Sequence, residues 1–156
     1  MSNGLSSTIR TVRTRVLSIL GGQSGVALLL GRLAVGLLFL STGWGKVHNI
    51  PKVTMFFEQL GIPAPGFHAV LVGWTELLGG AALVVGLCSR LAAVPLAVSM
   101  VVALVTAKRG DIHGIFDLVG QDEFTYLVVL VMIAILGPGK IALDRILAKK
   151  LDDAGM

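Results

Sequence analysis

Long apolar segments separated by short polar connections dominate the chain. Four such segments cover residues 26–46, 67–87, 91–107 and 124–136. An α-helix of about 20 residues rises about 30 Å, which matches the hydrocarbon core of a bilayer. The pattern therefore predicts an all-α fold, an integral membrane antiparallel four-helix bundle with basic amphipathic terminal helices.

The two ends of the chain carry the basic helices of this prediction. Residues 1–24 hold three arginines and place apolar residues at steps of four and three, which is typical of a helix lying on a membrane surface. The segment that ends near Lys149 and Lys150 shows the same spacing. We therefore divide the chain into a basic tail at residues 1–24, a four-span membrane domain at residues 25–147 and a second tail at residues 148–156.

The connections between the spans differ in length. Prolines flank residues 52–60, which are predicted to form a short helix at the membrane interface. The second span ends at Leu87 and the third begins at Leu91, with a break predicted at Ser89 and Arg90, and so short a connection makes these spans antiparallel neighbours. Residues 108–123 form a polar loop before the last span.

Composition supports a membrane protein. Of the 156 residues, 54% are hydrophobic and 14% are charged, and the mean hydropathy is +0.86. Soluble domains carry about 25% charged residues. The chain is also too short for a second domain. Its single cysteine, Cys88, cannot form an internal disulfide or a CxxC pair, which argues against membrane enzymes that work by thiol exchange.

The distribution of Lys and Arg predicts the orientation. Cytoplasmic loops are enriched in these residues. Eight of the 13 lie on the side of both termini, and four lie on the opposite side. Both termini are therefore predicted to be cytoplasmic in a multi-pass protein, with the lipid bilayer as its main partner. The net charge of +4 comes mostly from residues outside the apolar segments, so it gives little reason to expect a nucleic-acid partner.

Two ionisable residues lie inside apolar segments. Arg32 is in the first span, and Glu76 is the only acidic residue within any of the four. Such side chains are costly in hydrocarbon unless a partner or a polar cavity receives them, and they mark functional sites. If the span centres near Gly36 and Leu77 lie at one depth, Arg32 and Glu76 are within reach of each other. We therefore predict a buried Arg32–Glu76 ion pair.

Glycines share a helix face with these charges. The first span places Arg32, Gly36, Phe39, Gly43 and Lys46 at steps of four and three, and the second places Gly73, Glu76, Gly80, Leu83 and Leu87 in the same way. Glycine lets a neighbouring backbone approach closely, so the first two helices are predicted to pack along these faces. Arg32 and Lys46 have a simpler interpretation too, in which each extends its charge towards a headgroup layer.

A ligand site is predicted around the buried charges. Trp74 and Phe39 lie near the same depth and would suit a flat ring, so the candidate ligand-binding residues are Arg32, Glu76, Lys46, Trp74 and Phe39. The ion pair has an alternative role, which is to fix how the helices pack without any chemistry.

The three histidines are candidates for a second site. His48, His68 and His113 all fall on the outer side of the predicted topology, where they could meet near Lys46. Imidazoles beside a carboxylate such as Asp111 can hold copper or zinc or relay protons. Their spacing matches no known metal motif, so the histidines are alternatively isolated residues at the interface, and no metal is predicted.

Three segments together resemble the DoxX family. They are GRLAVGLLFLSTGWGKV, WTELLGGAALVVGLCSRLAA and LGPGKIALDRIL, and the similarity covers residues 26–147. The resemblance implies a four-helix bundle in the bacterial cytoplasmic membrane. It also implies a link to quinone-reducing thiosulfate oxidation or to redox-stress complexes, which relatives serve. Arg32, Lys46 and Glu76 match charged positions of the family.

Three functions remain open at this point. The first is a small membrane subunit that binds a quinone at the intramembrane site and serves an oxidoreductase partner, as an accessory rather than an independent catalyst. No stretch of the sequence supplies a cofactor motif, so a bound quinone is the only cofactor considered. The second is an assembly or chaperone-like module whose outer loops engage a partner. The third is a small transporter with Glu76 as its proton site, for which an oligomer would supply more spans.

Overall fold

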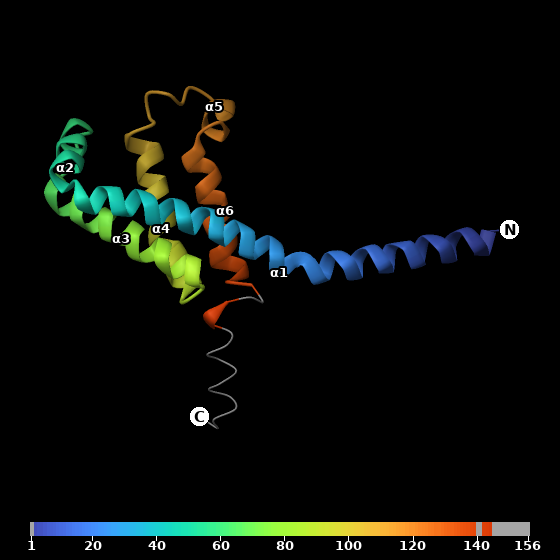
Figure 1. The fold of residues 1–156 in the computed structure, drawn as a ribbon. Helices are drawn as coiled ribbons and strands as arrows, with labels where there is room; N and C mark the ends of the chain where they lie inside the picture. Colours follow the sequence, from blue (N-terminus) through green and yellow to red (C-terminus); the bar gives the residue numbers. More distant parts are fainter. Residues whose placement is uncertain (1, 140–141, 145–156) are drawn as a thin grey trace.

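A computed structural model describes residues 2–139 and 142–144 of the chain, with side chains from residue 25 onward. This part is entirely helical (Figure 1). Its helices, in chain order, are α1 (Ser2–His48), α2 (Ile50–Gln59), α3 (Pro65–Val85), α4 (Ser89–Thr106), α5 (Ile115–Val119) and α6 (Asp122–Leu136). The prediction of an all-α protein is therefore confirmed for the described residues.

Helices α1 and α3 form the most extensive contact of the fold, and glycines bring their backbones together. A Cβ atom added to Gly80 would lie 2.4 Å from the backbone nitrogen of Leu40, and one added to Gly43 would lie 2.3 Å from that of Leu77. Only residues without a side chain allow so close an approach. The prediction that glycine-bearing faces pack the first two spans together is confirmed.

Helices α4 and α6 form a second pair, which crosses the first pair instead of running along it (Figure 1). The two pairs share a core of buried apolar side chains contributed by α1, α3, α4 and α6. Its members are Val35, Phe39, Leu83, Ala93, Leu96, Met100, Leu130 and Ile133. Gly79 of α3 lies against Leu96 of α4, and a Cβ atom there would come within 3.0 Å of the leucine.

The turn between α3 and α4 is held by the segment that follows α6. Gly86 ends α3 with φ +79°, a left-handed conformation that favours glycine. The Asp144 side chain accepts hydrogen bonds from the backbone N–H groups of Cys88 (2.7 Å) and Ser89 (3.4 Å), and its own N–H donates to the Gly86 carbonyl (3.1 Å). A carboxylate at this place satisfies free N–H groups at the start of α4.

The observed helices refine the predicted spans. Among the residues that the structure describes, three segments are long and apolar enough to cross a membrane, and these are Gly25–His48, Pro65–Val85 and Ser89–Thr106. Ser89 and Arg90 belong to the first turn of α4, so the break before this span lies at residues 86–88 rather than at 89 and 90. The predicted interfacial helix is α2, and the polar loop contains the short helix α5.

The fourth span and the two tails stay predictions. Helix α6 has 15 residues, which rise about 22 Å, less than a hydrocarbon core of about 30 Å. The backbone before residue 25 continues α1 as one helix and extends away from the other helices (Figure 1). The surface helix predicted near Lys149 and Lys150, and the tail at residues 148–156, lie outside the described residues.

Candidate functional site

Glu76 is the centre of a polar cluster inside the apolar helices. It lies in the middle of α3 with 1% of its surface exposed. The ammonium group of Lys46, in the last turn of α1, donates a hydrogen bond to Oε1 and forms an ion pair with it. The hydroxyl of Thr42, one turn earlier in α1, donates to Oε2 at 3.0 Å. Both carboxylate oxygens therefore have a donor, which a buried charge requires.

The predicted Arg32–Glu76 ion pair is wrong. Arg32 is 2% exposed, and its Nη1 donates to the carbonyl of Pro138 at 2.9 Å, at the opposite end of the helix pair. The guanidinium also lies beside Gly86, where an added Cβ would come within 2.5 Å of Nη1. Arg32 thus connects α1 to the segment after α6, and the partner of Glu76 is Lys46.

The register of α1 against α3 explains the error. Gly36 faces Val84, and Gly43 faces Leu77. The prediction placed Gly36 opposite Leu77, whereas the structure places it opposite Val84, so the observed register differs from the predicted one by seven residues. Seven residues are two helical turns, after which the same face returns. The same faces of α1 and α3 therefore meet in either register. The shift nevertheless moves each residue of α1 by about 10 Å along the helix axis relative to α3, and so changes its contacts.

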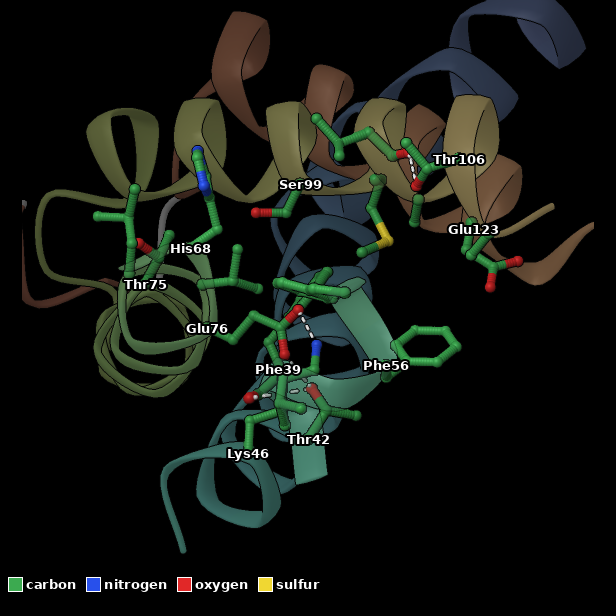
Figure 2. A pocket seen from close by; sticks show the side chains of 18 of the residues that line it. Phe39, Thr42, Lys46, Phe56, His68, Thr75, Glu76, Ser99, Thr106 and Glu123 are labelled. Atoms are coloured by element: carbon green, nitrogen blue, oxygen red, sulfur yellow. Dashed lines mark hydrogen bonds and ion pairs between the residues drawn. The ribbon is translucent and has the colours of Figure 1, made fainter. Parts of the chain in front are cut away.

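A cleft of about 1260 Å³ opens beside this cluster. Its walls come from α1, α2, α3, α4 and α6, and Figure 2 shows Glu76, Lys46 and Thr42 grouped at one side of it with α4 opposite. Apolar side chains make up most of the lining. The cleft thus combines a mostly apolar surface with a buried carboxylate paired to a partly exposed lysine, an arrangement typical of sites for small organic ligands.

Aromatic and charged residues complete the cleft. Phe39 lines it and meets Tyr126 of α6 edge to face, with ring centroids 6.5 Å apart. Lys108, two residues after the end of α4, and Glu123, in the first turn of α6, form a second ion pair, with 3.6 Å between Nζ and Oε1. The Lys108–Glu123 pair is more exposed than the Lys46–Glu76 pair. It joins the segment after α4 to the start of α6 at the rim of the cleft, where Figure 2 shows Glu123.

The structure sorts the predicted site residues into two groups. Lys46, Glu76 and Phe39 line the cleft, but Arg32 and Trp74 do not. Trp74 is 47% exposed, because its position on α3 is two residues from Glu76 and therefore on another face of the helix.

Sequence reasoning missed Thr42 and Tyr126. Thr42 precedes Lys46 by four residues, so their shared helix face was a usable signal. Tyr126 is the only tyrosine of the chain and lies within the fourth apolar segment, where a hydroxyl group is conspicuous.

The histidines do not assemble into a metal site. His48 and His68 each place Nδ1 near a carbonyl of their own helix region, those of Trp44 (2.9 Å) and Ala64 (3.2 Å). His68 also lines the cleft, whereas His113 lies in the loop before α5. Within residues 2–139 and 142–144, no three His, Cys, Asp or Glu side chains are arranged to hold a metal ion.

Residues 27–109, just over half of the chain, match the model of the DoxX family. The chain belongs to the DoxX family. It is 36% identical over 135 residues to the uncharacterized membrane protein Rv3486 of Mycobacterium tuberculosis, a match that covers 80% of this chain and 83% of the relative. The predicted resemblance is thereby confirmed, and the protein is an integral membrane protein.

Two further DoxX relatives carry informative names. The inner membrane protein YqjF of Escherichia coli is 30% identical over 125 residues, covering 80% of this chain and 95% of YqjF. A Bacillus subtilis protein named "Putative oxidoreductase CatD" is 31% identical over 126 residues, covering 80% of this chain and 89% of CatD. No solved structure matches the chain.

Proposed function

We propose that this DoxX protein is a small membrane subunit of a quinone-linked oxidoreductase or redox-stress complex, and that it binds a quinone in the cleft. The observation that carries the proposal is the buried Glu76 carboxylate, paired with the partly exposed Lys46, beside a mostly apolar cavity. It is an accessory role, in which a partner subunit performs the chemistry. The name of the Bacillus subtilis relative supports the oxidoreductase class.

The donor set of the cleft fits a quinone. A quinone offers a flat ring with carbonyl oxygens that accept hydrogen bonds, and when bound it carries electrons and protons between partners. The Lys46 ammonium has three N–H donors, of which one is directed to Glu76. Tyr126 adds a hydroxyl group, and Phe39 adds an aromatic surface at the same cavity. Lys46 and Tyr126 would hold the oxygens, while Phe39 would pack on the ring.

A binding measurement with two matched pairs of substitutions tests this proposal. The purified protein in lipid nanodiscs is titrated with a benzoquinone that carries a ten-carbon tail. Changing the Lys46–Glu76 pair in the variant K46M/E76Q should weaken binding at least tenfold, because the ring oxygens lose a charged donor. Changing the rim pair in K108M/E123Q should leave the affinity within about twofold, because a rim charge contributes little affinity.

Equal affinity for the wild type and K46M/E76Q would refute the assigned site. Circular dichroism of each variant shows whether the helices are intact, which separates a lost ligand from a lost fold. Lipid extraction of gently purified wild-type protein adds an independent readout, since a quinone that travels with the protein is expected in the extract.

A second candidate function is an assembly module, and helix α5 favours it. Phe116 is 88% exposed, and Ile115 and Val119 are more than half exposed on the same short helix. Large apolar side chains at the end of the outer loop are suited to contact with another protein. A partner that co-purifies with the wild type and with K46M/E76Q, but is lost from F116S, would support this function over the first.

We also propose that the protein lies in the bacterial cytoplasmic membrane with both termini in the cytoplasm. The excess of Lys and Arg on the side of the termini supports this orientation. Escherichia coli relatives named inner membrane proteins support the compartment. In this orientation α2, the loop with α5 and the rim of the cleft lie on the outer side.

A further inference from the structure

We infer that the ligand of the cleft is a long-chain amphiphile of the bilayer, which enters sideways between α3 and α4 and keeps its polar head at the Lys46–Glu76 pair. This inference deepens the proposed function and rests on it for the identity of the head as a quinone ring. The evidence is the size of the cleft, the distribution of its polar groups and the place where its lining is exposed.

The cleft is larger than a ring alone requires. Pockets for drug-sized ligands enclose about 300–1,000 Å³, and this one encloses about 1260 Å³. Its wall on α4 runs from Val94 to Thr106, and these 12 residue steps correspond to about 18 Å along the helix. A single aromatic head would leave most of this length empty, so the dimensions favour a ligand with a chain.

Charged groups are concentrated in the outer part of the cleft. Asn49, Lys52, Lys108 and Glu123 lie at the outer end, and the Lys46–Glu76 pair lies deeper. Beyond this pair the lining carries no charge; it is mostly apolar, with Leu38, Val94, Pro95 and Val98, and Thr75 and Ser99 add hydroxyl groups near the depth of Glu76. A ligand that matches this order has a polar head directed outward and a hydrocarbon chain on the inner side. A phospholipid and a polyprenyl quinone both have this general form.

The apolar end is open to the side. Close packing of Gly79 against Leu96 seals α3 to α4 just below Glu76. Val94 and Val98 of α4, which lie on either side of Leu96, line the cleft and are also about half exposed. In a spanning protein these side chains face lipid rather than water. The chain of the ligand therefore passes between α3 and α4 directly into the hydrocarbon layer.

Two valine substitutions on α4 test this path. Val98 lines the cleft, whereas Val101 is similarly exposed but lies outside the lining. In V98W the larger side chain should fill the exit between α3 and α4, and V101W should only enlarge the lipid-facing surface. The probe is a benzoquinone with a ten-carbon tail that ends in a diazirine, added to the full chain in nanodiscs, illuminated, and mapped by mass spectrometry of peptides.

The expected result is crosslinking concentrated on residues 94–98 of α4. The crosslinking yield at these residues should fall at least tenfold in V98W and stay within twofold of the wild type in V101W. Crosslinking that is equal in the two variants would overturn the inference, as would labelling spread evenly over all lipid-facing helices. A tail-free benzoquinone that binds as tightly as the tailed one, with V98W unaffected, would also overturn it while leaving the proposed quinone site intact.

The identity of the head is tested separately in the same preparation. Native mass spectrometry of the wild type, V98W and V101W without added probe reports any molecule retained from the membrane. A retained phospholipid that is lost in V98W but not in V101W supports the long-chain site and contradicts the quinone function. A retained quinone with the same dependence supports both.

Discussion

Replacing Gly80 by alanine is the sharpest test of how α1 and α3 are joined. The added Cβ would lie 2.4 Å from the nitrogen of Leu40, 2.8 Å from the oxygen of Gly36 and 2.9 Å from the carbonyl carbon of Phe39. Ordinary contacts of such atoms are about 3.5–4.0 Å. All three neighbours are backbone atoms, so no side chain can turn aside. The helices must therefore separate by about 1 Å along most of their contact.

The magnitude follows from two opposing effects. Inserting an extra methyl group into a packed interior costs about 1–3 kcal/mol, and a rigid backbone wall places Gly80→Ala at the upper end. Alanine is about 1 kcal/mol better than glycine within a helix, which offsets part of that cost. The expected net loss in the free energy of unfolding is about 2 kcal/mol. Lys46 and Glu76 should also move apart, because they lie on the two separated helices.

Gly45→Ala is the matched control. Gly45 is a helical residue of α1, and a Cβ atom there would meet nothing within 4 Å. This substitution should leave the free energy of unfolding unchanged or raise it by up to about 1 kcal/mol. The assay is reversible unfolding in mixed micelles with increasing dodecyl sulfate, followed by circular dichroism. If the two variants unfold at the same detergent fraction, the close approach of α1 and α3 at Gly80 is refuted.

Three further predictions concern the charges and the orientation. K46M should lower the free energy of unfolding by about 3 kcal/mol, because it leaves the buried Glu76 carboxylate with Thr42 as its remaining donor. The double variant K46M/E76L should recover most of this loss in the same detergent titration. An undiminished loss in the double variant would contradict the pairing of Lys46 with Glu76. D144A should lower the free energy of unfolding by about 1 kcal/mol, since α4 loses the carboxylate that accepts hydrogen bonds from its first N–H groups. D144N should restore part of this stability. Equal stability of D144A and the wild type would exclude the capping role of Asp144. Alkaline phosphatase fused within residues 108–123 should be active and a fusion after residue 156 inactive, and the reverse pattern would invert the proposed topology.

Much of the helical architecture could be predicted from apolar segments alone. Helices α3 and α4 begin and end within about two residues of the predicted spans, and the short helix before α3 is present as α2. The role of the glycines was also readable, because their spacing places them on one face with Phe39 and Glu76. Such features are local, since they depend on helix periodicity and on the length of an apolar segment.

The partners of the charged residues could not be predicted in the same way. The sequence indicates both Lys46 and Glu76 as site residues, but it predicts Arg32 as the ion-pair partner of Glu76, whereas the structure shows Lys46 in that place. Arg32 contacts the segment after α6 through Pro138, more than 100 residues later in the chain. No periodic pattern in the first span reports on so distant a turn. Likewise Tyr126 reaches the cleft only because α6 packs across α1.

The sequence by itself determined that this is a helical membrane protein of the DoxX family, which faces of its first two spans meet, and which ionisable side chains are buried. The tertiary structure alone decided the register of α1 against α3, and with it the exchange of Arg32 for Lys46 as the partner of Glu76. The physical reason is that a helix presents the same face every seven residues, so two registers satisfy one pattern. Only the backbone contacts at Gly36, Gly43 and Gly80 distinguish them.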